Sequence, residues 1–137
     1  MKLLLDTNVL LDVLAKREPF YDDSASIWAY VEAGRAEGVV SAISFNNVYY
    51  IVRRFSNRPK AIRAVETLSQ LFQVAPVNAR VIQKAIASSI KDFEDAIQWA
   101  SDTEVGIDRI ITRNTQDFPT DLPVALSPTE FLSTLES

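Results

Sequence analysis

The chain has 137 residues, 47% of them hydrophobic, so it can bury one substantial core but is short for two independent domains. It has no cysteine and no histidine, which excludes disulfides, thiolate zinc sites and catalysis by imidazole or thiolate. Its 14 basic and 18 acidic side chains give a net charge of −4, which argues against broad adhesion to nucleic acid or anionic membrane. We expect a single domain over 1–137 whose contacts with nucleic acid are local.

The first residues and the hydropathy pattern bear on where the protein acts. Met1 and Lys2 lead straight into a short apolar strand, whereas a signal peptide would have a longer apolar region. The apolar runs are all shorter than a membrane span. We therefore expect a soluble, cytoplasmic protein without a membrane partner.

Short apolar runs alternate with helical patterns along the chain. The predicted strands cover residues 2–5, 39–43, 73–75, 109–112 and 124–126. The predicted helices cover residues 8–15, 22–37, 44–55, 58–72, 79–88 and 93–103, with a last helix after Pro128. Ser44 is predicted to cap the helix over 44–55. The alternation predicts an α/β fold with a parallel sheet covered by helices on both faces.

Carboxylates stand beside several of these elements. Asp6 follows the first strand, Asp117 lies just beyond the strand at 109–112, and Asp92 and Asp95 open a helix. Strand C-termini and helix N-termini share one edge of such a sheet, so these four acids can converge there. Because packed carboxylates repel one another, a hard divalent cation is the natural way to keep them ionised.

Each acid also has a purely structural interpretation. Asp6 can cap the helix that follows it, and Asp92 with Asp95 can form a variant of a capping box. Asn114 and Asp117 can be ordinary turn residues. The convergence of four acids nevertheless favours a metal-dependent hydrolase over unrelated caps and turns.

Four segments resemble the motifs of PIN-domain proteins in order and spacing. They are residues 3–10 (LLLDTNVL), 41–47 (SAISFNN), 92–96 (DFEDA) and 112–118 (TRNTQDF), and the likeness runs from about residue 3 to residue 131. The resemblance implies a three-layer α/β/α sandwich, PIN-like and Rossmann-like, with a parallel central sheet. It also implies a metal-dependent ribonuclease of the kind found in the toxins of bacterial VapBC-type toxin–antitoxin pairs, with an RNA substrate, a cognate antitoxin and a homodimer.

The resemblance also assigns residues to the site. The catalytic and metal-binding residues that it implies, with Mg²⁺ or Mn²⁺ as the cofactor, are Asp6, Asp92, Asp95 and Asp117. Asn114 is the alternative to Asp117 for the last of these places. Asn47 stands where many relatives have glutamate, and Asn114 where many have aspartate. An amide brings no negative charge, so we expect weaker metal affinity and one ion. The alternative for Asn47 is a helix-start residue that follows the Ser44 cap.

In the expected mechanism, the ion lowers the pKa of a bound water and offsets charge on the phosphate, while Asp92 can orient that water or take its proton. Side chains expected to support the site by hydrogen bonds are Thr7, Asn8, Asn47, Thr112 and Asn114.

Positive charge for a substrate is concentrated between residues 53 and 63. That stretch lacks acidic residues and contains Arg53, Arg54, Arg58, Lys60 and Arg63. The nearby rings of Tyr49, Tyr50 and Phe55 suit stacking on unpaired RNA bases. The alternative is that the cations are merely solvated and the aromatic rings belong to the core. Lys16 and Arg17 are a second candidate flank.

Other functions fit less well. A phosphotransferase of the haloacid dehalogenase type would need a second acid at Asn8, and a response-regulator receiver would need a phosphoacceptor Asp on a middle strand and a later lysine. The main alternative is a catalytically weakened PIN-like domain that binds RNA or a protein partner, because Asn47 and Asn114 replace usual acids.

Overall fold

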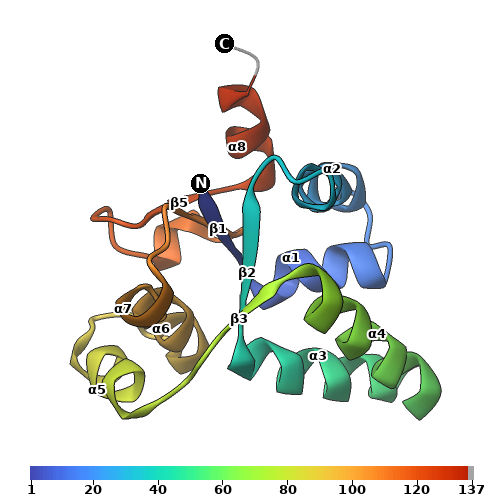
Figure 1. Ribbon diagram of the computed structural model, residues 1–137, viewed down its shortest axis with the longest axis horizontal. Coiled ribbons are helices and arrows are strands. Elements are labelled where there is room, and N and C mark those ends of the chain that lie inside the picture. Colours follow the sequence, from blue (N-terminus) through green and yellow to red (C-terminus); the bar gives the residue numbers. More distant parts are fainter. Residues whose placement is uncertain (136–137) are drawn as a thin grey trace.

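The computed structural model describes residues 1–135 and contains a five-stranded parallel sheet between two layers of helices (Figure 1). The strands are β1 (Lys2–Leu5), β2 (Glu37–Ser41), β3 (Gln73–Ala75), β4 (Arg109–Ile111) and β5 (Val124–Leu126). The helices are α1 (Thr7–Leu14), α2 (Tyr21–Glu32), α3 (Ala42–Phe55), α4 (Arg58–Leu71), α5 (Ala79–Ala87), α6 (Phe93–Ala100), α7 (Asp102–Val105) and α8 (Pro128–Thr134), with a 3₁₀ helix η1 (Thr115–Asp117). The predicted α/β/α sandwich is confirmed.

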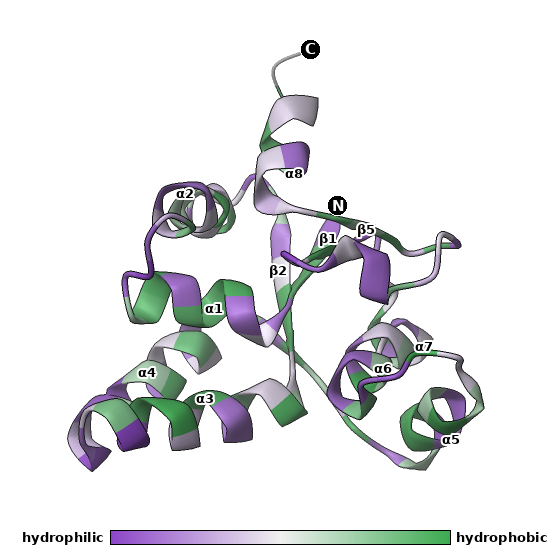
Figure 2. Ribbon diagram, turned by 180° about the vertical axis from the view of Figure 1, so that it is seen from behind, coloured by the Kyte–Doolittle hydropathy of each residue, from purple (hydrophilic) through white to green (hydrophobic). Residues whose placement is uncertain are grey.

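The strand β1 lies in the middle of the sheet, and its side chains pack into the core on both faces of the sheet. Leu3 and Leu5 are fully buried against the layer formed by α1 to α4, whereas Leu4 packs in the cluster on the opposite face. Successive side chains of a strand point to opposite faces, which is why an unbroken apolar run forms a strand buried on both sides. Figure 2 shows hydrophobic and hydrophilic residues alternating along α3 and α4, as expected of helices that cover a sheet.

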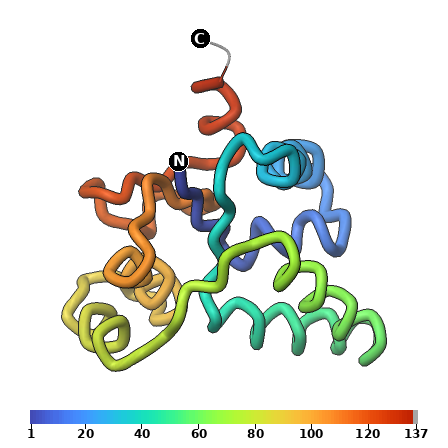
Figure 3. Tube along the Cα trace, in the orientation of Figure 1, coloured from blue at the N-terminus to red at the C-terminus, as the bar shows by residue number. Residues whose placement is uncertain are grey.

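The last helix closes the side of the domain near α2. The path of the chain in Figure 3 brings α8 back to the neighbourhood of α2. The rings of Tyr30 and Phe131 pack edge to face with their centroids 5.9 Å apart. This contact ties the C-terminal helix to an element from the first quarter of the chain. None of the helices within residues 1–135 is long and apolar enough to cross a membrane.

The structure corrects several predicted boundaries. The helix predicted over 22–37 ends at Glu32, because Gly34 takes a left-handed conformation (φ +76°) and Glu37 already pairs with β1. The helix predicted over 93–103 is divided at Ser101 into α6 and α7.

The correction at the start of α3 changes the interpretation of Asn47. The cap is Ser41, whose hydroxyl accepts a hydrogen bond from the Ile43 N–H at 3.3 Å, so the prediction that Ser44 caps the helix is wrong. The apolar run through Ile43 looked like strand, but the chain turns into a helix once Ser41 supplies a cap. Asn47 therefore lies in the second turn of α3, and its interpretation as a helix-start residue is also wrong.

Candidate metal site at the sheet edge

The sheet order places the candidate site. The strands follow the order β3-β2-β1-β4-β5. The chain adds β2 and β3 on one side of β1 and then adds β4 and β5 on the other side. The strand order therefore reverses between β1 and β4, which are neighbours. Ligands of parallel sheets bind beyond the strand C-termini at such a point. Asp6 directly follows β1 and Thr112 directly follows β4. The sequence thus brings two polar residues to the edge of the sheet where ligands bind.

Asp6 is a buried carboxylate held by two donors. Its side chain is 3% exposed, Oδ1 accepts a hydrogen bond from Nε2 of Gln98 at 3.0 Å, and Oδ2 accepts one from Oγ1 of Thr112 at 2.9 Å. Asp6 stands at the N-cap position of α1, but its side chain accepts no hydrogen bond from the N–H groups of that helix, so the interpretation of Asp6 as a side-chain cap is wrong. Each carboxylate oxygen has a further lone pair for a cation.

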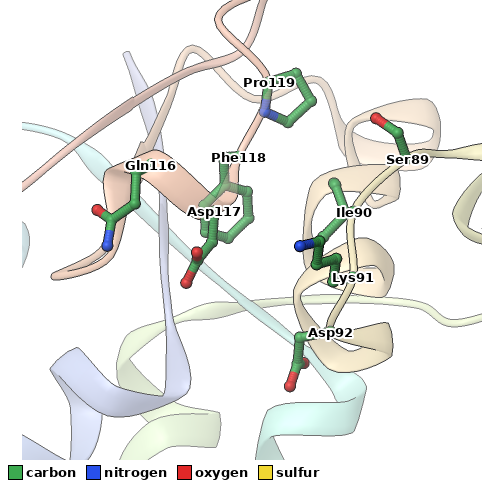
Figure 4. Close-up of a pocket in the computed structure, with 8 residues that line it drawn as sticks. All are labelled: Ser89, Ile90, Lys91, Asp92, Gln116, Asp117, Phe118 and Pro119. Carbon is green, nitrogen blue, oxygen red and sulfur yellow. The ribbon is translucent and has the colours of Figure 1, made fainter.

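Asp92 and Asp95 lie at the start of α6, and Asp117 is the last residue of η1. Asp92 caps α6, because its Oδ1 accepts the N–H of Asp95 at 3.0 Å, which confirms that part of the capping interpretation. Asp95 is half-buried, whereas Asp92 and Asp117 are exposed. In Figure 4 the carboxylates of Asp92 and Asp117 point towards the same side, although one belongs to the start of α6 and the other to η1.

The pKa of Asp95 reports how closely the acids gather. Burial, followed by the negative charge of Asp6 and of three further acids, raises this pKa from its ordinary 3.8 to about 7. The three are Asp92, Glu94 and Asp117. All four acids predicted from the sequence therefore share one electrostatic environment, together with a fifth.

Glu94 is a residue that sequence reasoning missed. Its Oε2 accepts hydrogen bonds from Oγ1 of Thr7 at 2.7 Å and from Nδ2 of Asn47 at 2.5 Å. Thr7 gives its only proton to Glu94, so the Ser44 hydroxyl, 2.7 Å from Oγ1 of Thr7, must donate to Thr7. The chain Ser44, Thr7, Glu94 and Asn47 thus joins α1, α3 and α6 beside the acids.

Gln98 was missed as well, although a signal was present. It lies three positions after Asp95 and four after Glu94, so helical spacing puts it on the face of α6 that carries the acids. It is fully buried, and its Oε1 has no hydrogen-bond partner among the described residues. A buried acceptor without a donor beside a carboxylate cluster is chemically suited to a site completed by a cation or a water.

The remaining predicted polar residues differ in their roles. Thr112 bonds Asp6 directly, whereas Asn114 contributes its backbone N–H, which donates to Oγ1 of Thr112 at 3.1 Å. No hydrogen bond in the described part of the chain joins the side chain of Asn8 to the cluster. Between Thr112 and Asn114, the guanidinium of Arg113 bonds both oxygens of the buried Asp12, at 2.9 and 3.3 Å. This pair fixes the loop after β4 to α1.

The donor set fits a hard divalent cation by its chemistry, but it is not a preformed cage. Within residues 1–135, no three acidic side chains, as they stand, are placed so that they could hold one metal ion. Mg²⁺ and Mn²⁺ prefer carboxylate and carbonyl oxygens, which this edge supplies. Coordination would require side-chain adjustment, for which the exposed Asp92 and Asp117 have room.

Sequence comparison decides the family. Residues 2–116 match the family described as PIN domain. The chain belongs to the PIN-domain family. A comparison with curated proteins gives no match.

Solved structures share the fold of this PIN domain. A toxin–antitoxin complex from Klebsiella pneumoniae contains a chain with 23% identity and a TM-score of 0.68, covering 91% of this chain and 96% of that one. VapBC-1 of nontypeable Haemophilus influenzae gives 22% identity and a TM-score of 0.70, covering 94% and 99%. VapC20 of Mycobacterium tuberculosis, described as a sarcin–ricin loop cleaving toxin, gives 17% identity and a TM-score of 0.64, covering 79% and 86%.

The basic residues of this PIN domain that were predicted to contact RNA lie just after α1, in the last turn of α3 and on α4. Arg53, Arg54 and Arg58 are exposed, and Arg17 is half-buried. Lys16, Lys60 and Arg63 line one groove of about 680 Å³ together with Phe55. We call this set the basic groove; it joins the two flanks that the sequence left as alternatives.

Phe55 lines the basic groove, and the side chains of Tyr50 and Phe55 lie outside the core. Tyr50 and Phe55 are 54% and 53% exposed, so their interpretation as core residues is wrong. Tyr49 is half-buried and packs against the main core cluster, as its core interpretation requires, and its ring meets that of Tyr50 edge to face with centroids 5.2 Å apart. Exposed rings next to cations are suited to stacking on bases.

Proposed function

We propose that this protein is a Mg²⁺- or Mn²⁺-dependent endoribonuclease that acts in the cytoplasm as the toxin of a type II toxin–antitoxin pair. The observation that carries the proposal is the gathering of carboxylates around Asp95 at the edge of a PIN-domain sheet. Four acids that raise the proton affinity of a fifth repel one another, and the cap and hydrogen bonds that some of them make do not require all five to be together. A site for a divalent cation explains why they are together.

Different residues would bind the ion, hold the first acid in position and orient the water. Asp6, Asp95 and one or both of Asp92 and Asp117 would hold the ion, which supplies an acidified water and positive charge beside the phosphate. Asp6 is already held in position by Gln98 and Thr112. Asp92 accepts the Asp95 N–H with Oδ1, which leaves Oδ2 to orient a water or take its proton.

The partners are proposed from fold relatives. The solved structures include VapBC complexes, and one relative is described as cleaving the sarcin–ricin loop. RNA as the substrate, a cognate antitoxin and a homodimer are accordingly the proposed partners, and the whole of 1–137 is the proposed single domain. The basic groove and the exposed rings of Tyr50 and Phe55 support contact with unpaired RNA.

The test is cleavage of RNA by the purified protein. Cleavage should require Mg²⁺ or Mn²⁺ and should be lost in Asp6→Asn and in Asp95→Asn, with circular dichroism spectra unchanged. Asp121→Asn, an exposed loop acid outside the site, is the matched control and should retain activity. Full cleavage in excess chelator, or by both site variants, would refute the proposal.

A second candidate is a PIN domain with weakened catalysis that binds RNA or a protein. Two observations favour it: Asn47 donates to Glu94 where relatives usually place a further acid, and no three acids within residues 1–135 stand ready to hold an ion. Calorimetric titration of Mn²⁺ separates the two functions. Binding that disappears in Asp6→Asn supports the enzyme, whereas absence of binding supports the binding module.

A further inference from the structure

Glu94 carries a negative charge that no basic side chain of the described residues neutralises. Within residues 1–135 its carboxylate forms no ion pair, and the same holds for Asp6, Asp92, Asp95 and Asp117. Glu94 is half-buried, so water screens its charge less than it would screen that of an exposed acid. The other four acids have roles in the proposed mechanism, whereas Glu94 has none. A fifth carboxylate at this edge of the sheet adds repulsion unless a cation offsets it.

The hydrogen bonds of Glu94 fix one of its two carboxylate oxygens. Oε2 accepts from Oγ1 of Thr7 at 2.7 Å and from Nδ2 of Asn47 at 2.5 Å. These donors belong to α1 and α3, so two elements other than α6 hold the carboxylate in place. Oε1 accepts no hydrogen bond from the described residues. One oxygen is therefore positioned by the protein, and the other keeps its lone pairs for a ligand.

Two contacts place Glu94 next to Asp6. Thr7, which donates to Glu94, directly follows Asp6 in the chain. Gln98 lies four positions after Glu94 on the same face of α6, and its Nε2 donates to Oδ1 of Asp6. The oxygen of the same amide is buried and accepts no hydrogen bond from residues 1–135. A buried acceptor without a donor is costly, and a water bound to a cation is a donor suited to it.

The electrostatics of Asp95 agree with this placement. Burial raises its pKa most, and the charges of Asp6, Asp92 and Glu94 follow in that order, ahead of Asp117. Glu94 and Asp95 are adjacent on α6, so their side chains leave the helix in different directions. Glu94 therefore belongs to the same group of charges as Asp95, although its own hydrogen bonds are with α1 and α3.

We propose that Glu94 is a further ligand of the divalent cation, with Oε1 as the binding atom, and that Asn47 and Thr7 position it. The inference rests on the proposed function and adds to it a ligand outside the four predicted acids. The amide of Asn47 brings no charge of its own, but it holds the carboxylate that does. Carboxylate oxygens are ligands that Mg²⁺ and Mn²⁺ prefer. The alternative role of Glu94 is a purely structural link from α6 to α1 and α3.

Glu94→Gln separates these two roles. The new amide keeps an oxygen that can accept from Thr7 and Asn47, but the charge is removed. Calorimetric titration should show that Mn²⁺ binds about tenfold or more weakly than to the wild type, because a ligand of the ion is lost. Urea denaturation in chelator should show no loss of stability, since repulsion is relieved. A purely structural link predicts unchanged affinity for Mn²⁺.

The control for Glu94→Gln removes the same charge elsewhere. Glu66 is an exposed acid on α4, outside the site. Glu66→Gln should bind Mn²⁺ as the wild type does. This comparison separates a ligand of the ion from a general effect of net charge.

A double-mutant cycle tests whether Asn47 acts through Glu94. Asn47→Ala removes a donor that holds Oε2, so it should weaken Mn²⁺ binding in the wild-type background. In the Glu94→Gln background the same substitution should have little further effect, because the carboxylate that Asn47 positions is already gone. Asn46→Ala, at an exposed neighbour, is the control in both backgrounds.

The outcomes separate this inference from the proposed function. Mn²⁺ binding that is lost in Asp6→Asn but unchanged in Glu94→Gln would overturn the inference and leave the proposed function standing. Equal effects of Asn47→Ala in the two backgrounds would overturn the positioning role of Asn47. A wild type that binds no Mn²⁺ would refute the proposed function and the inference with it.

Discussion

The side-chain amide of Gln98 donates a hydrogen bond to Oδ1 of Asp6 across 3.0 Å, although 92 positions separate the two residues in the chain. Gln98 is fully buried in α6, and Asp6 follows β1 at 3% exposure. A hydrogen bond to a buried charge is stronger than one between neutral groups, because the charge has lost its hydration. The contact fixes both the packing of α6 on the sheet and the orientation of the first acid.

Replacement of the Gln98 amide should weaken both the packing of α6 on the sheet and the positioning of Asp6. Gln98→Leu preserves the volume approximately but leaves Oδ1 of Asp6 without its donor, so we expect a decrease of about 2 kcal/mol in the free energy of unfolding. Urea denaturation measures the decrease, and Mn²⁺ calorimetry should show weaker binding. Gln83→Leu on the exposed face of α5 should change stability by less than about 0.5 kcal/mol. Equal stability of Gln98→Leu and the wild type would show that the contact is not energetically important.

Asn47→Glu should show how the negative charge of Glu94 affects stability and metal affinity. The new carboxylate would replace an amide that donates to Oε2 of Glu94, so in chelator we expect the free energy of unfolding to fall by about 1 kcal/mol, from repulsion and from removal of that hydrogen bond. Added Mn²⁺ should bind about tenfold more tightly than to the wild type and reverse part of that decrease.

Asn46→Glu provides the matched control for this substitution. Asn46 precedes Asn47 in α3 but is exposed, so a carboxylate there should alter neither stability nor metal affinity appreciably. If the two variants behave alike in calorimetry and denaturation, position 47 has no part in the site.

The stability of the metal-free protein should fall as the pH rises from about 4 to about 7. The pKa of Asp95 is about 7 in the folded protein against an ordinary 3.8, so between these values the folded state holds a proton that the unfolded state releases. Folding is therefore favoured at lower pH, and the penalty of ionising Asp95 is fully present above about pH 7.

Asp95→Asn should remove this pH dependence. We expect on the order of 1 kcal/mol of stabilisation at pH 8 and less than about half of that at pH 5, after allowance for the solvent that screens a half-buried group. Urea denaturation in chelator at both pH values measures it, with Asp121→Asn as the comparison. A wild-type stability that rises from pH 6 to pH 8 in step with Asp95→Asn would contradict the raised pKa.

The basic groove should determine the salt dependence of RNA binding. Replacing Lys16, Lys60 and Arg63 by glutamine should lower the slope of log affinity against log salt by about 0.7 for each phosphate that the variant no longer binds. Fluorescence anisotropy with a single-stranded RNA in chelator measures the slope. The same experiment on Arg53, Arg54 and Arg58 shows whether the cations outside the groove contribute.

Lys84→Gln is the control for a charge on the other face of the sheet, since Lys84 lies on α5 with its ammonium over the ring of Trp99. It should leave the slope unchanged. A groove triple variant with the wild-type slope would mean that these cations are only solvated.

The alternation of elements was predictable because local physics decides it. The unbroken apolar run of β1 can only be a strand buried on both faces, and the helices follow from periodicity and caps. Boundaries were less certain where two local signals compete, as at Ser41 and Ser44, either of which can cap α3. The buried neighbour Thr7, which accepts the Ser44 hydroxyl, occupies Ser44 and leaves Ser41 as the cap.

The sequence by itself determined the parallel sheet, and with it that Asp6, Asp92, Asp95 and Asp117 would reach one edge. Chain order is enough for this, because strands that alternate with helices run parallel, and parallel strands all have their C-termini at the same edge of the sheet. Only the tertiary structure decided which groups hold these acids. Gln98 bonds Asp6, and Asn47 and Thr7 bond Glu94, through contacts between α1, α3 and α6. Such contacts depend on side-chain packing between distant segments; helical spacing places Gln98 on the acidic face of α6 but does not show that Asp6 is its partner.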